Sequence, residues 1–408
     1  LSTYGTEFYR KATHGEGFIR GFFNVIKSAT TGTGAALERL FITGVSPVTM
    51  DDVTSGFNIG TNITNDSWFN DLVGFSENEL REMLEYYKEQ GVLQESIDEI
   101  VAMMKPNYDN YCFSEDTLEQ CMFNSDMALY FLKSFVLHHK KPKEIVDPNI
   151  RTDFNKLAYL IKLDHGLGEN FSVIKEIAEQ GEIITDIVTH FSALEMTDPS
   201  NFKSLLFYFG LLSIKGVDMV GRPILHVPNL VVREQLFNFL IQGYIKHDIF
   251  KIDMNKMSAL FENMAFRGDW KPLFDFIANA VREQSRIREY IEGEAHIKGF
   301  LLAYLGMYRY YQLYPEYELN KGFADFFFKP SLSVPVLPPF TYLLEVKYAK
   351  AGASEKEIRA LADEAREQLL RYSEDELVAE AKAKGELKLI TIVWRSWELA
   401  LLEEVTLS

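Results

Sequence analysis

The sequence predicts a helix-rich chain of mixed class (α/β, or α+β overall), with a C-terminal core built on a sheet. Two observations support this. Residues 126–266 are mostly of helical period, whereas apolar runs rich in aromatic and β-branched residues lie at 320–328, 342–347 and 387–394. Helical patterns precede the first run and separate the last two. We therefore expect the order helix, strand, strand, helix, strand.

The N-terminal residues are predicted to form helices joined by loops. Residues 1–48 carry an amphipathic helical pattern that ends in a short strand from Phe41, and residues 56–74 are loop-rich. Ser76 and Glu79 form a capping-box pattern that predicts a helix through about Gln90. A second helix is expected from Ser96 to Met104, ended by Pro106.

Periodicity and turn residues divide the rest of the chain. The sequence predicts a hairpin at 214–227, and helices at 127–138, 151–160, 174–179, 201–212, 229–246, 254–266 and 270–281. We expect three domains, at 1–105, 106–265 and 266–408.

Composition limits the class of protein. The 408 residues suffice for two or three domains, and 47% hydrophobic with 25% charged residues indicates a globular, soluble chain. The sequence contains no stretch of 18 apolar residues free of charged residues, so no membrane span is predicted. We expect a cytoplasmic protein. Two cysteines, Cys112 and Cys121, favour a reducing compartment, with a disulfide left open.

Three charged residues stand where core residues would be expected. Glu345 and Lys347 share one face of a strand, about 7 Å apart, because side chains alternate along it. Asp325 supplies a second carboxylate from an otherwise aromatic run. Two carboxylates and a lysine could serve Mg²⁺-dependent phosphodiester hydrolysis, in which the acids hold the cation and the lysine offsets phosphate charge. The alternative is a solvated ion pair at a sheet edge.

These residues resemble a known signature. Asp325 followed by Glu345-x-Lys347 is similar to the D…(D/E)xK motif of the PD-(D/E)XK nuclease superfamily. Residues 292–302, with Glu294, resemble the helix that opens that fold, and 365–372 resemble its A-x-x-Q-x-x-x-Y helix, with Gln368 as the amide.

The resemblance implies a restriction-endonuclease-like αβββαβ core. It also implies Mg²⁺ or Mn²⁺ bound by Glu294, Asp325 and Glu345, catalysis by Asp325, Glu345, Lys347 and Gln368, and DNA as the substrate. The spacing of Ala365, Gln368, Leu369 and Tyr372 further predicts that Gln368 faces the sheet.

A second resemblance concerns the N-terminal part. Residues 41–48, 55–62 and 74–80 resemble the end of an AAA-like ATPase module, which a bacterial family common in Bacteroidetes fuses to such a nuclease. The following helix pair resembles the lid of that module. No G-x-x-x-x-G-K-[ST] motif occurs, so the ATP site is incomplete and no ATPase activity is expected. We therefore expect a fragment, with a module remnant at 1–105, a helical connecting domain at 106–265 and a nuclease-like domain at 266–408.

Two functions remain open at the level of sequence. One is a metal-dependent nuclease acting on DNA, and the alternative is an inactive nuclease fold that serves protein interaction or regulation, with a protein partner or as a homo-oligomer. The net charge of −17 opposes nucleic-acid binding over the whole surface. A local basic rim is compatible with it, although ordinary solubilising charge explains the same lysines: Lys321, Lys329, Lys347, Lys350 and Lys356.

Overall fold

The computed structural model describes residues 5–30, 34–44, 60–139, 142, 145–146, 168–189, 191–192, 195–196, 198–246, 253–283, 293–306, 308, 310–319, 322–331, 334, 336–383 and 385–406. It divides into two compact units. The N-terminal unit comprises Leu1–Lys140, Val146–Ile177 and Glu182–Val232, and the C-terminal unit comprises Lys141–Ile145, Ala178–Gly181 and Arg233–Ser408. The predicted three-domain division stays a prediction.

The N-terminal unit is mainly helical. A small antiparallel sheet of order β1-β3-β2 lies within it, and β2 with β3 confirms the predicted hairpin. Its elements are α1 (Gly5–Thr13), α2 (Phe18–Thr30), η1 (Ser67–Phe69), α4 (Glu77–Glu89), α5 (Ile97–Tyr108), η2 (Glu115–Thr117), α6 (Ser125–His138), α8 (Glu169–Gln180), β1 (Glu182–Ile184), α9 (Pro199–Tyr208), β2 (Ser213–Val217) and β3 (Pro223–His226). Helix α10 (Leu230–Lys246) begins here and continues into the C-terminal unit.

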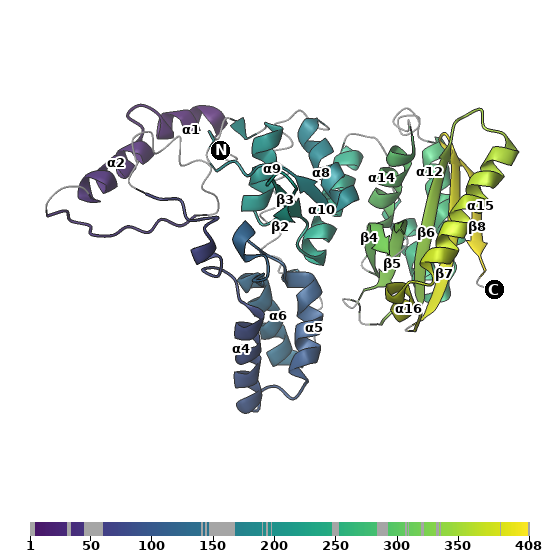
Figure 1. The fold of residues 1–408 in the computed structure, drawn as a ribbon, viewed down its shortest axis with the longest axis horizontal. Coiled ribbons are helices and arrows are strands. Elements are labelled where there is room, and N and C mark those ends of the chain that lie inside the picture. Colours follow the sequence, from purple (N-terminus) through teal and green to yellow (C-terminus); the bar gives the residue numbers. More distant parts are fainter. Residues whose placement is uncertain are drawn as a thin grey trace. The chain divides into compact units, whose positions relative to one another are not determined.

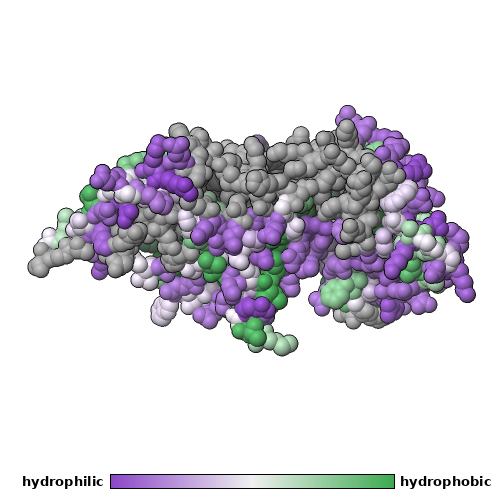
Figure 2. Space-filling model, turned by 90° about the horizontal axis from the view of Figure 1, so that it is seen from above, coloured by the Kyte–Doolittle hydropathy of each residue, from purple (hydrophilic) through white to green (hydrophobic). Residues whose placement is uncertain are grey.

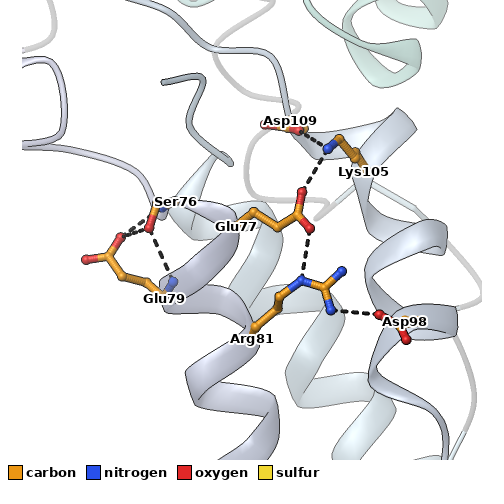
Figure 3. Close-up of polar contacts among 7 residues, drawn as sticks. All are labelled: Ser76, Glu77, Glu79, Arg81, Asp98, Lys105 and Asp109. Atoms are coloured by element: carbon orange, nitrogen blue, oxygen red, sulfur yellow. Dashed lines mark hydrogen bonds and ion pairs between the residues drawn. The ribbon is translucent and has the colours of Figure 1, made fainter. Parts of the chain in front are cut away.

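The predicted capping box is present at the start of α4 (Figure 3). Ser76 Oγ accepts a hydrogen bond from the Glu79 amide at 3.2 Å, and Glu79 Oε2 accepts one from the Ser76 amide at 2.8 Å. The predicted end of α5 at Pro106 was wrong, because the helix continues to Tyr108. Proline removes only its own amide donor, and the burial of Tyr108, which is 1% exposed, favours the extra half-turn.

Ion pairs join α4 to α5 across their exposed sides (Figure 3). Arg81 donates to Glu77 Oε1 at 2.9 Å and to Asp98 Oδ1 at 2.8 Å. Lys105 completes the network by donating to Glu77 Oε2 at 2.8 Å. These side chains are partly solvated, so their ion pairs contribute little to stability. We infer that they mainly fix the orientation of α4 relative to α5.

Other sequence predictions met mixed outcomes. The helices predicted from 127, 229, 254 and 270 are confirmed as α6, α10, α11 (Met254–Arg267) and α12 (Lys271–Glu283). Residues 41–44 form no strand, and α9 ends at Tyr208 because Gly210 adopts a left-handed conformation with φ +69°. The predicted helix at 151–160 lies outside the described residues.

Cys112 and Cys121 face each other next to a short antiparallel bridge. Tyr111 and Met122 exchange reciprocal backbone hydrogen bonds of 3.1 and 2.8 Å. Cys112 and Cys121 flank this isolated bridge, and their thiols are close enough to form a hydrogen bond. A hydrogen bond from Cys121 lowers the pKa of the Cys112 thiol to about 7.

We expect this thiol pair to oxidise readily in the folded protein. One thiolate displaces a glutathione from oxidised glutathione, and the second cysteine displaces the other, leaving a disulfide and two reduced glutathiones. Closing this short loop should stabilise the N-terminal unit by about 2–3 kcal/mol. Intact mass after alkylation and urea denaturation measure both effects, with Cys121→Ser as the control. Two alkylatable thiols remaining after native incubation with excess oxidised glutathione would contradict the expectation.

The C-terminal unit is a five-stranded mixed sheet flanked by helices (Figure 1). Strands β4, β5 and β6 form an antiparallel meander, β7 pairs parallel to β6, and β8 closes the sheet antiparallel to β7. After α11 and α12 come α14 (Glu294–Leu305), β4 (Tyr311–Leu319), β5 (Gly322–Pro330), β6 (Phe340–Ala349), α15 (Glu355–Tyr372), α16 (Glu376–Ala383), β7 (Glu386–Arg395) and β8 (Glu398–Val405).

Helices cover both faces of this sheet. The Tyr342 hydroxyl of β6 donates to the Met264 carbonyl of α11 at 2.6 Å. The next residue, Leu343, faces the other side, where it packs with Leu369 and Tyr372 of α15. Both faces of the central strands are therefore buried, which explains their nearly continuous apolar sequences.

The predicted mixed α and β class with a C-terminal αβββαβ core is confirmed, in the order α14, β4, β5, β6, α15, β7. Strand β4 had no clear sequence signal because Pro315 and several polar residues interrupt its pattern. Its place at the sheet edge tolerates the proline, which has no amide to donate. Strand β8 was not predicted either, since its Glu-rich sequence is polar for a strand.

Among the described residues, no helix combines the length and the apolar character needed to cross a bilayer. The face seen in Figure 2 is mostly hydrophilic where it is described, with hydrophobic side chains in small, separate groups.

Candidate active site

The site lies where strands β5 and β6 stop pairing through their backbones. The backbone pairing of β5 with β6 ends at Phe326 opposite Leu344, so Asp325 and Glu345 face each other just beyond it. Beyond this point, side-chain carboxylates accept the hydrogen bonds of backbone amides that strand pairing would otherwise satisfy. Asp325 Oδ2 accepts the Val346 amide at 2.7 Å, and Glu345 Oε1 accepts the Asp325 amide at 3.4 Å. Both acids are thus fixed by backbone, with Asp325 5% and Glu345 2% exposed.

A lysine from α14 lies against these acids. Lys298 Nζ is 2.5 Å from Asp325 Oδ1, 3.1 Å from Glu294 Oε1 and 3.0 Å from Glu316 Oε1. Glu294 is one helical turn before Lys298, so the two share a face of α14. The structure therefore links Glu294 to Asp325 through the Lys298 ammonium group.

Lys347 lies on the other side of Glu345. Its Nζ is 3.8 Å from Glu345 Oε2 and 3.2 Å from Glu364 Oε1 of α15, and its side chain is 13% exposed. Glu345 and Lys347 share a strand face, as their spacing predicts.

Burial governs the ionisation of the two central acids. It raises the pKa of Glu345 to about 9, and the nearby Asp325 carboxylate adds to this rise. Burial also raises the pKa of Asp325, although the Lys298 ammonium opposes it. For Lys298 itself, burial lowers the pKa, but the Asp325 and Glu316 carboxylates outweigh this and hold it above its ordinary value. Burial and the neighbouring Asp325 carboxylate therefore favour the protonated form of Glu345.

Glu316 reaches the site through an unusual backbone conformation. Its φ is +42°, and the β4–β5 register passes from Pro315 to Tyr317 without it. A non-glycine residue with positive φ is uncommon and often marks a functional position. Glu316 was not predicted as a site residue. The preceding proline, Pro315, is the one local feature that could have indicated an irregular backbone there.

The predicted Gln368 lies on α15, one turn after Glu364. Its side chain is partly buried, and its Oε1 atom is buried with no hydrogen-bond partner among the described residues.

Four residues after Gln368 on α15, Tyr372 packs near the start of β5. A Cβ added at Gly322, which has φ +140°, would meet the Tyr372 hydroxyl at 2.9 Å, so only glycine fits there.

The structure thus gathers Asp325, Glu345 and Lys347 directly, and places Glu294 behind Lys298. The site holds five carboxyl groups (Glu294, Glu316, Asp325, Glu345 and Glu364) and two ammonium groups (Lys298 and Lys347). This excess of oxygen ligands suits a hard divalent cation. Within the described part of the chain, however, no three acidic, histidine or cysteine side chains are arranged to hold a metal ion. The three-carboxylate metal site stays a prediction.

One comparison with known proteins identifies a match in this part of the chain. A family model described as the PD-(D/E)XK nuclease superfamily matches residues 292–404, which include α14, the whole five-stranded sheet except its last residue, and the residues discussed above. No curated protein matches the chain. The resemblance of the N-terminal residues to an AAA-like ATPase module has no support from these comparisons. Residues 292–404 form a PD-(D/E)XK nuclease superfamily domain at the C-terminal end of the chain.

Proposed function

We propose that the C-terminal unit is a metal-dependent nuclease that hydrolyses phosphodiester bonds in DNA. The observation that carries this proposal is the opposition of Asp325 and Glu345 where the β5–β6 ladder opens, with Lys347 on the same strand face as Glu345. Acidic residues fixed by backbone amides are preorganised, so little rearrangement is needed to present them to a ligand.

Asp325 and Glu345 would hold a Mg²⁺ or Mn²⁺ ion, with Glu294 as a further candidate ligand. When bound, such an ion supplies Lewis-acid activation of the phosphodiester. The donor set fits because it is made of carboxylate oxygens and carries excess negative charge. Lys298 now contacts Asp325 and Glu294, so its ammonium would have to move aside for both to serve as ligands.

Lys347 would act on the substrate. Its ammonium group is positioned by Glu345 and Glu364 and can donate to an oxygen of the attacked phosphate, where negative charge grows in the transition state. Gln368 lies on the same helix as Glu364, and its amide oxygen has no hydrogen-bond partner among the described residues. This oxygen would orient the attacking water by accepting a hydrogen bond from it.

Nicking of supercoiled plasmid tests the proposal. We expect wild-type protein to nick DNA with Mn²⁺ but not with EDTA, and expect Asp325→Asn and Glu345→Gln to abolish nicking while Asp275→Asn, an exposed change on α12, leaves it intact. Calorimetry should show Mn²⁺ binding to wild type and none to Asp325→Ala. Equal Mn²⁺ binding by wild type and Asp325→Ala would refute this site.

One observation favours the alternative, an inactive domain that serves protein interaction or regulation. Asp325 and Glu345 are almost completely buried, and Lys298 already neutralises Asp325. If neither DNA nor RNA is cut at any Mn²⁺ concentration, this function becomes the better one. In that case a protein partner or a second copy of the chain, sought by pull-down and light scattering, is the ligand to expect.

The N-terminal assignment remains a proposal resting on resemblance alone. If residues 1–105 belong to an AAA-like ATPase module without its phosphate-binding loop, added ATP should neither be hydrolysed nor change the nicking rate.

A further inference from the structure

A second group of charged and aromatic side chains lies on β4 and β5, away from the candidate active site. Lys329 Nζ is 5.2 Å from the ring centroids of Tyr317 and Phe327 and 5.6 Å from that of Tyr314, and 3.3 Å from the Tyr317 hydroxyl oxygen. Arg233 Cζ, at the start of α10, is 4.9 Å from the same Tyr314 ring centroid. We call these five residues the β4–β5 basic cluster.

No carboxylate in the described part of the chain pairs with either cation of this cluster. Among the described residues, neither Arg233 nor Lys329 is within ion-pair distance of a carboxylate, and Arg233 Nη1 is buried without a hydrogen-bond partner. Glu380, an exposed residue of α16, acts on Lys329 only from a distance. Burial lowers the pKa of both Arg233 and Lys329. Two partly desolvated positive charges that share one ring are unfavourable unless an anion joins them.

Other buried lysines of the C-terminal unit show what the cluster lacks. Lys388 also lies over an aromatic ring, 5.6 Å from the Phe340 centroid, but its Nζ is 3.1 Å from Glu386 and 3.0 Å from Glu404. Lys298 and Lys347 likewise have carboxylate partners. Lys329 therefore differs from the other three, because it contacts aromatic rings but pairs with no carboxylate of the residues that the structure describes.

The cluster and the active site lie along one strand. Asp325, Phe327 and Lys329 alternate onto the same face of β5, so Lys329 is four residues, or roughly 13 Å, from Asp325 along the strand. Phosphates of one DNA strand follow each other at a rise of about 3.4 Å. Because each phosphate is also displaced around the helix axis, this rise does not fix a nucleotide count, but a strand cut at Asp325 and running along β5 would bring a phosphate a few nucleotides away to the height of Lys329.

We propose that the β4–β5 basic cluster is a subsite for a backbone phosphate of the nucleic-acid strand whose scissile phosphate lies at the active site. This rests on the proposed nuclease function. Lys329, which is half-buried, makes the contact, and Arg233 supplies a second positive charge from the less accessible side. The phosphate contact strengthens binding and fixes the position of the strand relative to the active site, without reading base sequence. It also provides an acidic chain with a local positive site for a polyanion.

Binding without chemistry tests the subsite. Fluorescence anisotropy of a labelled DNA duplex in EDTA, at several salt concentrations, is measured for wild type, Lys329→Gln, Arg233→Gln and Lys388→Gln. We expect Lys329→Gln to weaken binding to all sequences alike and to reduce the slope of log K against log salt by about 1. Lys329→Arg should keep the slope, and Lys388→Gln, whose lysine is already paired, should match wild type.

The outcomes separate the subsite from the nuclease function. A wild-type slope in correctly folded Lys329→Gln, as judged by circular dichroism, overturns the subsite, as does the absence of wild-type DNA binding at low salt. Loss of slope in Lys329→Gln supports the subsite even if wild type never cuts DNA with Mn²⁺, a result that would refute only the nuclease function. If Lys329→Gln fails to fold, the slope of Arg233→Gln decides, because loss of the second charge should also weaken binding.

Discussion

Replacement of Lys347 by alanine is expected to lower the rate of DNA nicking about 10²–10³-fold, as loss of one preorganised donor to a developing charge does in other enzymes. The reason is that Lys347 would stabilise charge on the phosphate without itself holding the metal. Mn²⁺ affinity measured by calorimetry should therefore stay within a few-fold of wild type. Single-turnover nicking with saturating Mn²⁺ isolates the chemical step from binding.

Lys388→Ala is a matched control for this change. Lys347 and Lys388 lie on neighbouring strands, each is 13% exposed, and each has two carboxylate partners. Lys388 pairs in the sheet with Tyr342, five positions from Lys347. Similar losses in the two variants would indicate a general effect on the fold. Undiminished nicking by Lys347→Ala would place the activity elsewhere or in a contaminant.

Replacement of Lys298 by methionine is expected to destabilise the C-terminal unit by about 3 kcal/mol. Methionine keeps the length of the side chain but removes the cation 2.5 Å from Asp325, whose side chain is only 7% exposed. Breaking a buried pair by removing one partner costs about 3–5 kcal/mol because the remaining charge is uncompensated. Hydrogen exchange of β5 and β6 peptides, together with urea denaturation followed by the fluorescence of Trp270 and Trp394, measures the loss.

A double variant identifies the cause. Lys298→Met with Asp325→Asn should recover most of the stability, because the second change removes the unpaired charge. The exposed pair between Arg359 and Glu403 provides the comparison, since Arg359→Met should cost less than about 1 kcal/mol. Bound Mn²⁺ should also restore Lys298→Met by supplying a cation to Asp325. A Lys298→Met protein as stable as wild type would show that solvent already screens the Asp325 charge.

Local sequence patterns were sufficient to predict most of the C-terminal core and the shared strand face of Glu345 and Lys347. Alternation along a strand has a period of two, so Glu345 and Lys347 had to share a face wherever the strand was placed. The order of helix and strand patterns around Asp325 was likewise enough to predict the mixed class and most of the αβββαβ core. Capping at Ser76 was equally local, because the box involves only residues three apart.

Which charged side chains meet depends on long-range packing, and no local pattern predicted it. Lys298 was not predicted as a site residue, because its contact with Asp325 depends on how α14 packs against the sheet. Glu316 reaches the site through a positive φ at a position that the β4–β5 register omits, and no residue pattern predicted this conformation.

The same limit applies to the β4–β5 basic cluster. The sequence showed Lys329 as one of several lysines that could be either a basic rim or solubilising charge. The difference lies in what surrounds it: aromatic rings from two strands, a second cation from α10, and no carboxylate in reach among the described residues. Spacing along a chain fixes which side chains share a face, whereas long-range packing fixes their neighbours and hence their desolvation and pairing. For this protein, local spacing therefore predicted which charged side chains share a strand face, whereas long-range packing determines which of them form ion pairs.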